Sequence, residues 1–316
     1  MSSNSNYPNG FLGGLTVRGM PITLLHPGNI FWVNNSSVLP DKGIGGSNGN
    51  KGTYHQPFST IDYAIGNCKA SRGDIVAVMP GHAETIAGAA GVTSDVAGVA
   101  IVGLGTGSLR PQITFSATAS TWSVTAANLT FYNLQFIAGI AEVVTMHNVA
   151  ATADCMSWEN CWWTEGTGFN WVNAVTMATG ADNSSWVGCK AIGADANNDA
   201  WITGVAHDGF YMDNCYVAAN VAQTTAHGLI DSSGNMTNVE IKNSSFRSNI
   251  DAALWVDFNG AANGGVIKNC VVSSLDAAGA TSTGDFSGGH FFECYVSGEA
   301  NAFGVVGGGG VVYNDA

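Results

Sequence analysis

The chain has 316 residues, a formal net charge of −13 and 42 glycines, and only 10% of its residues are charged. So acidic a chain does not suit a nucleic-acid backbone, because that partner requires a basic face. Hydrophobic residues make up 46% of the chain, whereas the Lys, Glu and Arg that cover helical surfaces are scarce. Short strands joined by Gly, Asn and Ser turns need few charges, so the composition predicts an all-β protein.

The first 40 residues differ in charge from the rest. They contain one Arg, Arg18, and no Asp or Glu, so 9 of the 10 basic and all 23 acidic residues belong to the remainder. The sequence starts without the basic and apolar regions of a signal peptide, and no apolar run approaches the roughly 20 residues that span a bilayer. We therefore expect a near-neutral arm over residues 1–40 and an acidic body over 41–316. We also expect synthesis in a cytoplasm and no membrane partner.

The first regular element of the body is expected to be a helix. Apolar residues at positions 58, 61, 64, 65 and 68 follow the i, i+3, i+4, i+7 spacing of an amphipathic helix. This spacing predicts a helix over about 58–69. The segment Asp74–Met79 then has the character of a buried strand, and Pro80-Gly81 ends it.

A six-residue pattern recurs along the rest of the chain. Its seven copies begin at Phe131, Trp158, Trp186, Met212, Ile241, Ile267 and Phe291. Their third positions lie 24 to 29 residues apart, and a weaker copy over residues 101–104 precedes them. The first, fourth and sixth positions are mostly apolar, and the third, usually Asn or Gly, interrupts the period of two that a strand would show.

The interruption predicts the corner of a coil. Asn and Gly tolerate the left-handed αL conformation better than other residues, and one αL residue between two short strands turns the chain sharply. The corner asparagines of successive coils would stack as a ladder: Asn133, Asn160, Asn214, Asn243 and Asn269. The repeat therefore predicts a right-handed parallel β-helix solenoid with coils over about 74–300. The helix over 58–69 would cap the first coil, and residues 307–313 suggest only a terminal strand.

Five of the seven cysteines occupy one column of the repeat. They are Cys161, Cys189, Cys215, Cys270 and Cys294. The CxxC pairing of a zinc site is absent, and nothing indicates a secretory context that would favour disulfides. We therefore expect stacked, reduced and buried thiols that act as small apolar spacers. Cys68 and Cys155 lie outside the column and receive no role.

The first coils resemble a known group of proteins. The region Phe58–Glu84 contains the elements Pro-Phe-Ser-Thr-Ile, Arg-Gly-Asp and Pro-Gly-His-Ala-Glu, and it continues through Asp95–Gly105 to Arg110-Pro111. These elements look like the start of pectin-lyase-like β-helices and, more narrowly, are similar to β-helix proteins of tailed-bacteriophage virions. The resemblance covers about residues 28–140. It implies a capsid decoration (cement) or related head or tail surface protein, commonly a homotrimer, with the major capsid protein as its partner.

Glycan cleavage is the main competing function, because hydrolysis needs two carboxylates about 5–10 Å apart. Outward positions of the repeat carry Glu159, Asp213, Lys242 and Lys268, and adjoining loops are expected to carry Asp199, Asp208 and Asp257. Asp208 and Asp213, with His207, form the best acidic cluster, although solvated surface residues would look the same. Arg247 is the only Arg after Arg110, and no Asp cluster surrounds it in sequence, so the signal for a lyase is poor.

Other motifs also have plain structural explanations. Asp195–Asp199 has the oxygen spacing of a calcium loop, but Ala200 replaces the required Gly and no Glu occupies position 12. Gly103–Gly107 lacks the Lys and the helix of a phosphate loop. Tryptophans that could stack on sugars or at a protein interface are Trp162, Trp163, Trp171, Trp201 and Trp255. Trp158 and Trp186 fall in an apolar column and are expected to be interior.

The sequence thus predicts a virion structural protein without enzymatic activity. It would decorate and reinforce the capsid surface, dock through the arm over 1–40 and be made in the host cytoplasm. We expect no catalytic residue, cofactor or metal ion. The first alternative is a receptor-binding spike or polysaccharide depolymerase acting on host glycans, and the second is a bacterial surface adhesin or glycan lyase.

Overall fold

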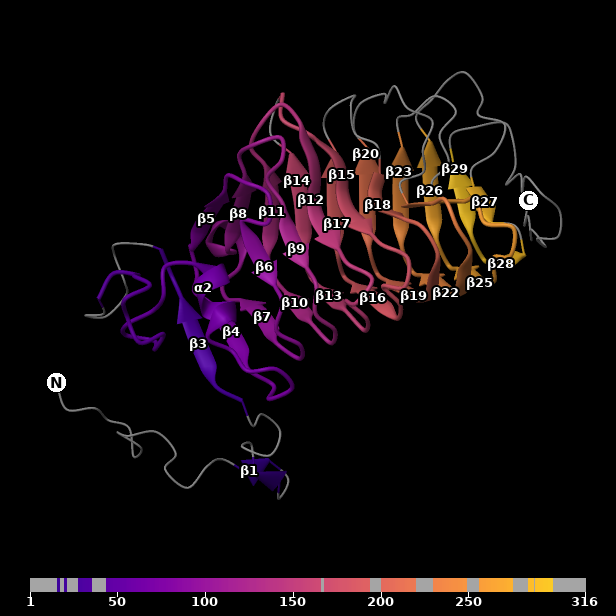
Figure 1. Cartoon of the computed structure of the whole chain (residues 1–316). Helices are drawn as coiled ribbons and strands as arrows, with labels where there is room; N and C mark the ends of the chain where they lie inside the picture. The colour runs from indigo at the N-terminus through magenta and orange to yellow at the C-terminus, as the bar shows by residue number, and fades with distance from the viewer. Residues whose placement is uncertain are drawn as a thin grey trace.

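The chain forms a parallel β-helix, and Figure 1 shows its coils stacked along one axis. The computed structural model describes residues 16–17, 20–21, 28–35, 44–165, 168–193, 200–219, 230–248, 256–274, 284–286 and 288–297. Within these residues, three sheets of parallel strands run the length of the body. Each full coil contributes one strand to each sheet, so residues far apart in sequence become neighbours between coils.

The first sheet has ten strands. In spatial order they are β3 (Ile30–Val33), β4 (Ile75–Val78), β7 (Ala100–Gly103), β10 (Thr130–Tyr132), β13 (Ser157–Glu159), β16 (Ser184–Val187), β19 (His207–Asp213), β22 (Met236–Lys242), β25 (Gly265–Lys268) and β28 (Gly289–Phe292). These strands carry the first positions of the sequence repeat. The all-β parallel β-helix predicted from that repeat is confirmed.

The second and third sheets have nine and eight strands. The second contains β5 (Ala83–Ile86), β8 (Gln112–Phe115), β11 (Gln135–Ala138), β14 (Trp162–Glu165), β17 (Lys190–Gly193), β20 (Tyr216–Ala219), β23 (Ser245–Ser248), β26 (Val271–Ser274) and β29 (Tyr295–Ser297). The third contains β6 (Val92–Ser94), β9 (Trp122–Val124), β12 (Val143–Val149), β15 (Trp171–Met177), β18 (Ala200–Gly204), β21 (Ile230–Ser232), β24 (Val256–Phe258) and β27 (Gly284–Phe286).

The corner between the first and second sheets is formed by the residues that the sequence indicated. Asn133, Asn160, Asn214, Asn243 and Asn269 all have φ between 50° and 56°. The ladder that they form has two parts. Asn160 donates to the amide oxygen of Asn133 at 3.0 Å, and Asn269 donates to that of Asn243 at 2.7 Å. Gly188, which has no amide side chain, and Asn214 take the corners between the two parts. The Asn243 amide donates to Asp213 at 2.8 Å and not to Asn214, so the ladder is interrupted there.

The interior is a buried column of stacked side chains. Phe131, Trp158 and Trp186 lie in register on successive coils with nearly parallel rings, whose centroids are 3.9 and 5.4 Å apart. Cys161, Cys189, Cys215 and Cys270 are buried as predicted, and Cys294 is half-buried. Burial raises the pKa of the Cys161 thiol to about 12, so this thiol stays protonated and behaves as an apolar spacer.

A short helix closes the first coil. Helix α2 (Ile61–Gly66) begins after Thr60, whose hydroxyl accepts the backbone N–H of Tyr63. Its buried residues Ile61, Ala64 and Ile65 belong to the core shared with β3, β4 and β6. This confirms the predicted cap, although the regular helix is shorter than residues 58–69. A single 3₁₀ turn (Gly107–Leu109) precedes Arg110.

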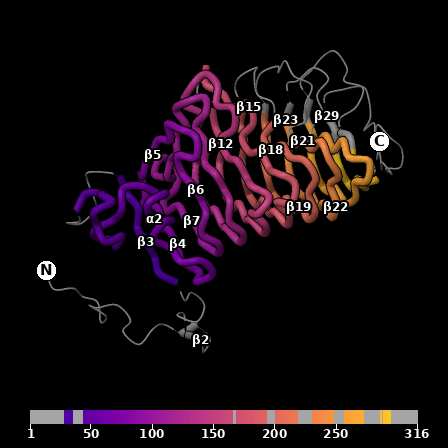
Figure 2. The backbone as a smooth tube through the Cα atoms, in the orientation of Figure 1, coloured from indigo at the N-terminus to yellow at the C-terminus, as the bar shows by residue number. Residues whose placement is uncertain are grey.

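Part of the predicted arm belongs to the solenoid. Strand β3 pairs in parallel with β4, so residues 30–33 form the first rung of the first sheet. Upstream, β1 (Thr16–Val17) and β2 (Met20–Pro21) pair antiparallel. Figure 2 follows the backbone along the stacked coils, from β3 and β4 near the N-terminal end to β22 toward the other end. The docking role of the arm stays a prediction, and the terminal strand expected over 307–313 lies outside the described residues.

Candidate functional site

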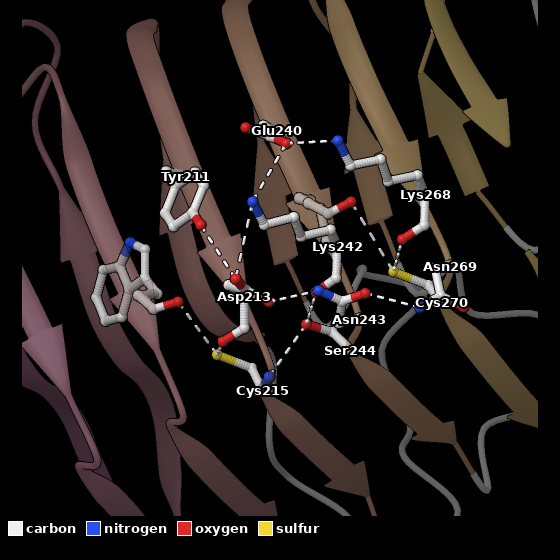
Figure 3. A network of polar contacts seen from close by, with 12 residues as sticks. Tyr211, Asp213, Cys215, Glu240, Lys242, Asn243, Ser244, Lys268, Asn269 and Cys270 are labelled. Atoms are coloured by element: carbon white, nitrogen blue, oxygen red, sulfur yellow. Dashed lines mark hydrogen bonds and ion pairs between the residues drawn. The ribbon is translucent and has the colours of Figure 1, made fainter.

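The outer faces of the three sheets carry the side chains that are available to bind or react with other molecules. On the first sheet, Tyr211 and Asp213 of β19 lie beside Glu240 and Lys242 of β22, and Lys268 follows on β25 (Figure 3). Lys268 contacts Glu240 at 2.8 Å, and Lys242 lies 3.5 Å from Glu240 and 3.8 Å from Asp213. The outward orientation predicted for the Asp213, Lys242 and Lys268 positions is therefore confirmed.

This network neutralises its own carboxylates. The hydrogen bond from Lys268 is the main reason why the pKa of Glu240 lies below its usual value. Asp213 accepts hydrogen bonds from the Tyr211 hydroxyl at 3.1 Å and from the Asn243 amide at 2.8 Å. A carboxylate whose pKa is lowered in this way stays ionised, so Glu240 is not suited to donate a proton at neutral pH.

The acidic cluster expected from His207, Asp208 and Asp213 does not form. Asp208 lies just before the αL residue Gly209, where the chain turns, and Asp213 lies at the far end of β19. Asp208 is exposed, and hydrogen bonds from Thr237 and Asn238 lower its pKa. His207 is buried. The cluster prediction failed because the corner at Gly209 separates Asp208 from Asp213, and the sequence analysis did not identify that corner.

The third sheet carries a row of aspartates that the sequence analysis did not find. Asp231 of β21 pairs in register with Asp257 of β24, and Asp257 pairs with Asp285 of β27. Asp257 was expected in a loop, but it lies on a strand whose neighbours Val256 and Phe258 face the core. Its side chain is only 7% exposed. The sequence signal that could have revealed this row is an Asp between two apolar residues, repeated at steps of 26 and 28 residues. The signal is weak because Ser232 and Gly284 replace apolar residues in two of the three copies.

The tryptophans divide differently from the prediction. Trp158 and Trp186 are interior as expected, but Trp163, Trp171 and Trp201 are buried as well. Trp162 alone among the described candidates is half-buried on an outer face, where it contacts Arg110 and Lys190. Trp255, the Asp199 carboxylate and the calcium-like loop 195–199 lie outside the described residues.

The described part of the chain contains neither a metal-binding cluster nor a membrane-spanning helix. No group of three or more His, Cys, Asp or Glu side chains there has the geometry to hold a metal ion. No helix in that part is both long and apolar enough to cross a bilayer. Glu159 lies on β13 of the first sheet and Arg247 on β23 of the second. The glycine-rich segment 103–107 forms the end of β7 and the turn that follows it.

Comparisons with known proteins do not assign the chain to a family. No protein-family model matches the chain, and no curated protein matches it. A solved structure of a rhamnogalacturonan lyase is similar over 91% of this chain and 86% of its own, with 13% sequence identity and a TM-score of 0.45. A likeness this distant assigns no family, substrate or mechanism to this chain.

The comparison nevertheless corrects one expectation. We predicted a protein without enzymatic activity, and the similar solved structure is an enzyme, a lyase. The prediction is therefore contradicted. Its basis was the missing catalytic constellation in the sequence, and the aspartate row on the third sheet shows that the repeat can align carboxylates that sequence spacing alone did not bring together.

Proposed function

We propose that the chain is a surface protein of a tailed-bacteriophage particle, attached through the N-terminal end of its solenoid. The observation that carries this proposal is a set of exposed apolar side chains at that end. These are Ile30, Ile44, Tyr54 and Tyr63, each at least 40% exposed. Exposed apolar groups gathered at one place are typical of an interface.

The four side chains belong to one continuous piece of structure. Ile30 opens β3, and the Ile44 backbone N–H donates to His55, the neighbour of Tyr54. The Tyr54 ring packs edge-on against Trp32 of β3 at 5.0 Å, and the Tyr63 ring packs against Phe58 at 4.9 Å. Residues 30–33, which belong to the predicted arm, form the first rung of the solenoid at this same end (Figure 1). An apolar end and a near-neutral arm suit a protein shell better than solvent.

The rest of the molecule supports the same orientation. Outside residues 1–40 the chain carries 9 basic and 23 acidic residues, and this acidic body would project away from the particle. Negative charge at that distance keeps particles apart in solution. In this proposal the partner is the major capsid protein, the protein is made in the host cytoplasm, and three copies assemble on the capsid as a decoration. The homotrimer rests on the resemblance of residues 28–140 and on the preference of oligomers for closed symmetry.

Binding to particles that lack this protein tests the proposal. Ile44→Asp places a charge on the proposed contact, and Val271→Asp is the matched control, because Val271 is 46% exposed but lies on the second sheet far along the solenoid. We expect co-sedimentation with particles to fall at least tenfold for Ile44→Asp and to be unchanged for Val271→Asp. A truncation lacking residues 2–27 tests the arm and leaves β3 in place. Wild-type binding by both Ile44→Asp and the truncation would refute the attachment.

The aspartate row favours a second candidate, a polysaccharide depolymerase acting on host glycans. Neighbouring parallel strands are roughly 4.8 Å apart, so the paired Asp231 and Asp257 approach the carboxyl separation of retaining glycosidases. Asp257 is shielded from solvent and Asp231 is half-buried, which matches an acid and a base in different surroundings.

Release of reducing ends from host capsular polysaccharide or lipopolysaccharide tests this candidate. Asp257→Asn and Asp231→Asn should each lower the rate at least a hundredfold, because general acid–base groups contribute about that much or more. Asp213→Asn is the control, since its carboxylate belongs to the neutralised network on the first sheet. Equal activity in all three variants, or none in the wild type, would eliminate the candidate.

A further inference from the structure

The outer face of the second sheet holds two cations against one indole ring. The Arg110 guanidinium lies 4.1 Å from the centre of the Trp162 ring, and the Lys190 ammonium lies 5.2 Å from it. The same ammonium is 5.5 Å from the centre of the Tyr216 ring. Trp162, Lys190 and Tyr216 are in register on β14, β17 and β20, so the cluster follows the solenoid axis.

Neither cation has a carboxylate partner among the described residues. Arg110 donates to the backbone and side-chain oxygens of Asn160, and no hydrogen bond from the Lys190 ammonium is found in that part of the chain. Elsewhere the pattern is different: Lys242 and Lys268 contact Glu240, and Arg72 contacts Asp74. Two cations without a counter-charge are unexpected in a chain with 23 acidic and only 10 basic residues.

The burial of Arg110 makes this arrangement costly. Arg110 is only 5% exposed, and its Nε–H is buried without a hydrogen-bond partner in the described structure. Desolvation is the main reason why its pKa lies below the usual value. An arginine remains charged in spite of such a shift, so the fold bears the cost of a desolvated positive charge. An anion bound nearby would offset that cost.

The surroundings provide access for such an anion. Trp162 and Lys190 are half-buried and Tyr216 is exposed, so solvent reaches the ammonium between the two rings. Aromatic faces stabilise a cation but accept none of the three N–H donors of an ammonium in a strong hydrogen bond. The Lys190 donors are therefore available, and Arg110 adds a second positive charge within about 10 Å of them.

We propose that Lys190 and Arg110, which both contact the Trp162 ring, form a binding site for an oxyanion group of a small ligand. This oxyanion is a carboxylate or a phosphate. Lys190 donates hydrogen bonds to the oxyanion, Arg110 supplies the second charge, and the Trp162 and Tyr216 rings contact the apolar part that carries the group. The site is separate from the aspartate row, which lies on the third sheet.

Titration calorimetry with two probes tests the site. Inorganic phosphate and acetate are titrated into the full chain at constant ionic strength set by chloride, so that general screening is the same throughout. Binding of both probes identifies a shared oxyanion site, whereas binding of phosphate alone identifies a phosphate site. Lys190→Gln is expected to weaken binding at least tenfold, as the loss of a charge-assisted hydrogen bond predicts. Lys268→Gln is the matched control, because Lys268 is paired with Glu240.

Arg110→Gln tests the second charge, and Arg110→Lys keeps the charge in case the neutral variant does not fold. Arg110→Lys should retain binding within a few-fold of the wild type. The proposal is overturned if Lys190→Gln binds phosphate like the wild type, or if Lys268→Gln is weakened equally. It is also overturned if sedimentation shows that the wild type self-associates and that Lys190→Gln abolishes the association, because the cluster would then be an interface between copies.

Discussion

The buried His147 should make the solenoid unstable in acid. This residue has no exposed surface and is surrounded by the rings of Phe115, Phe136, Trp122 and Trp158, with centroids 4.3 to 6.0 Å away. Desolvation lowers its pKa from 6.5 to about 3. The imidazole is therefore neutral in the folded chain at every pH at which a free histidine would begin to be protonated.

The sign of the effect follows from that shift. Below pH 6.5 His147 is protonated in the unfolded chain, but in the folded chain it is not protonated until the pH reaches about 3. The stability that depends on a neutral His147 is thus complete above pH 6.5 and is lost as the pH falls toward 3. At about 1.4 kcal/mol per pH unit, the loss is about 3 kcal/mol at pH 4 and levels off at about 5 kcal/mol.

The variant His147→Leu separates this term from general acid denaturation. The Trp163 indole N–H donates to His147 Nδ1 at 3.3 Å, so the variant should lose about 1–3 kcal/mol at pH 7.5 through the unpaired donor. Between pH 7.5 and 4, however, its free energy of unfolding should fall by about 3 kcal/mol less than that of the wild type. Urea denaturation at a series of pH values measures both quantities. Identical pH slopes for wild type and variant would refute the reasoning, and exposed His55→Gln is the control for an unburied histidine.

Three further predictions concern the corner, the cap and the cysteines. Asn160→Val puts a β-branched residue at φ 52° and removes a ladder hydrogen bond, so urea denaturation should show a loss of about 2–3 kcal/mol, with Asn160→Gly losing less. Glu84→Ala removes the carboxylate that accepts from the Ile61 N–H and contacts His82, each at 3.0 Å, and amide exchange in α2 should accelerate at least tenfold while later coils keep their protection. Iodoacetamide at pH 8 should alkylate exposed Cys155 while Cys161 remains unmodified, and equal labelling in the folded protein would contradict the buried column.

The corner between the first and second sheets could be predicted because residues that tolerate the αL conformation mark it in the sequence. Asn or Gly recurs there at a nearly fixed period, and the αL conformation is the physical reason for that choice. The second corner, between the third and first sheets, was missed although it uses the same conformation. Its αL residues are Asn128, Cys155, Asn183, Gly209 and Asn238. Cys155 breaks the residue pattern, and this corner explains a cysteine to which the sequence gave no role.

The outer faces were harder to predict than the core. A core position repeats because it must stay apolar, but an outward position accepts almost any side chain, so its register is visible only after the strands are paired. Asp257 illustrates this point, since its alignment with Asp231 depends on loops of different length in successive coils. The tryptophans show the converse. Trp163, Trp171 and Trp201 were interpreted as surface platforms, but indole rings fill the wide interior of these coils.

Anomalous scattering from sulfur in crystals of the protein tests the stacked-coil account most directly. The account predicts that the Sγ atoms of Cys161, Cys189 and Cys215 lie in one row inside the solenoid, with successive atoms roughly one strand spacing of 4.8 Å apart. Sulfur positions that are scattered, or that face solvent, would contradict the coil register on which both the apolar N-terminal end and the aligned outer faces depend.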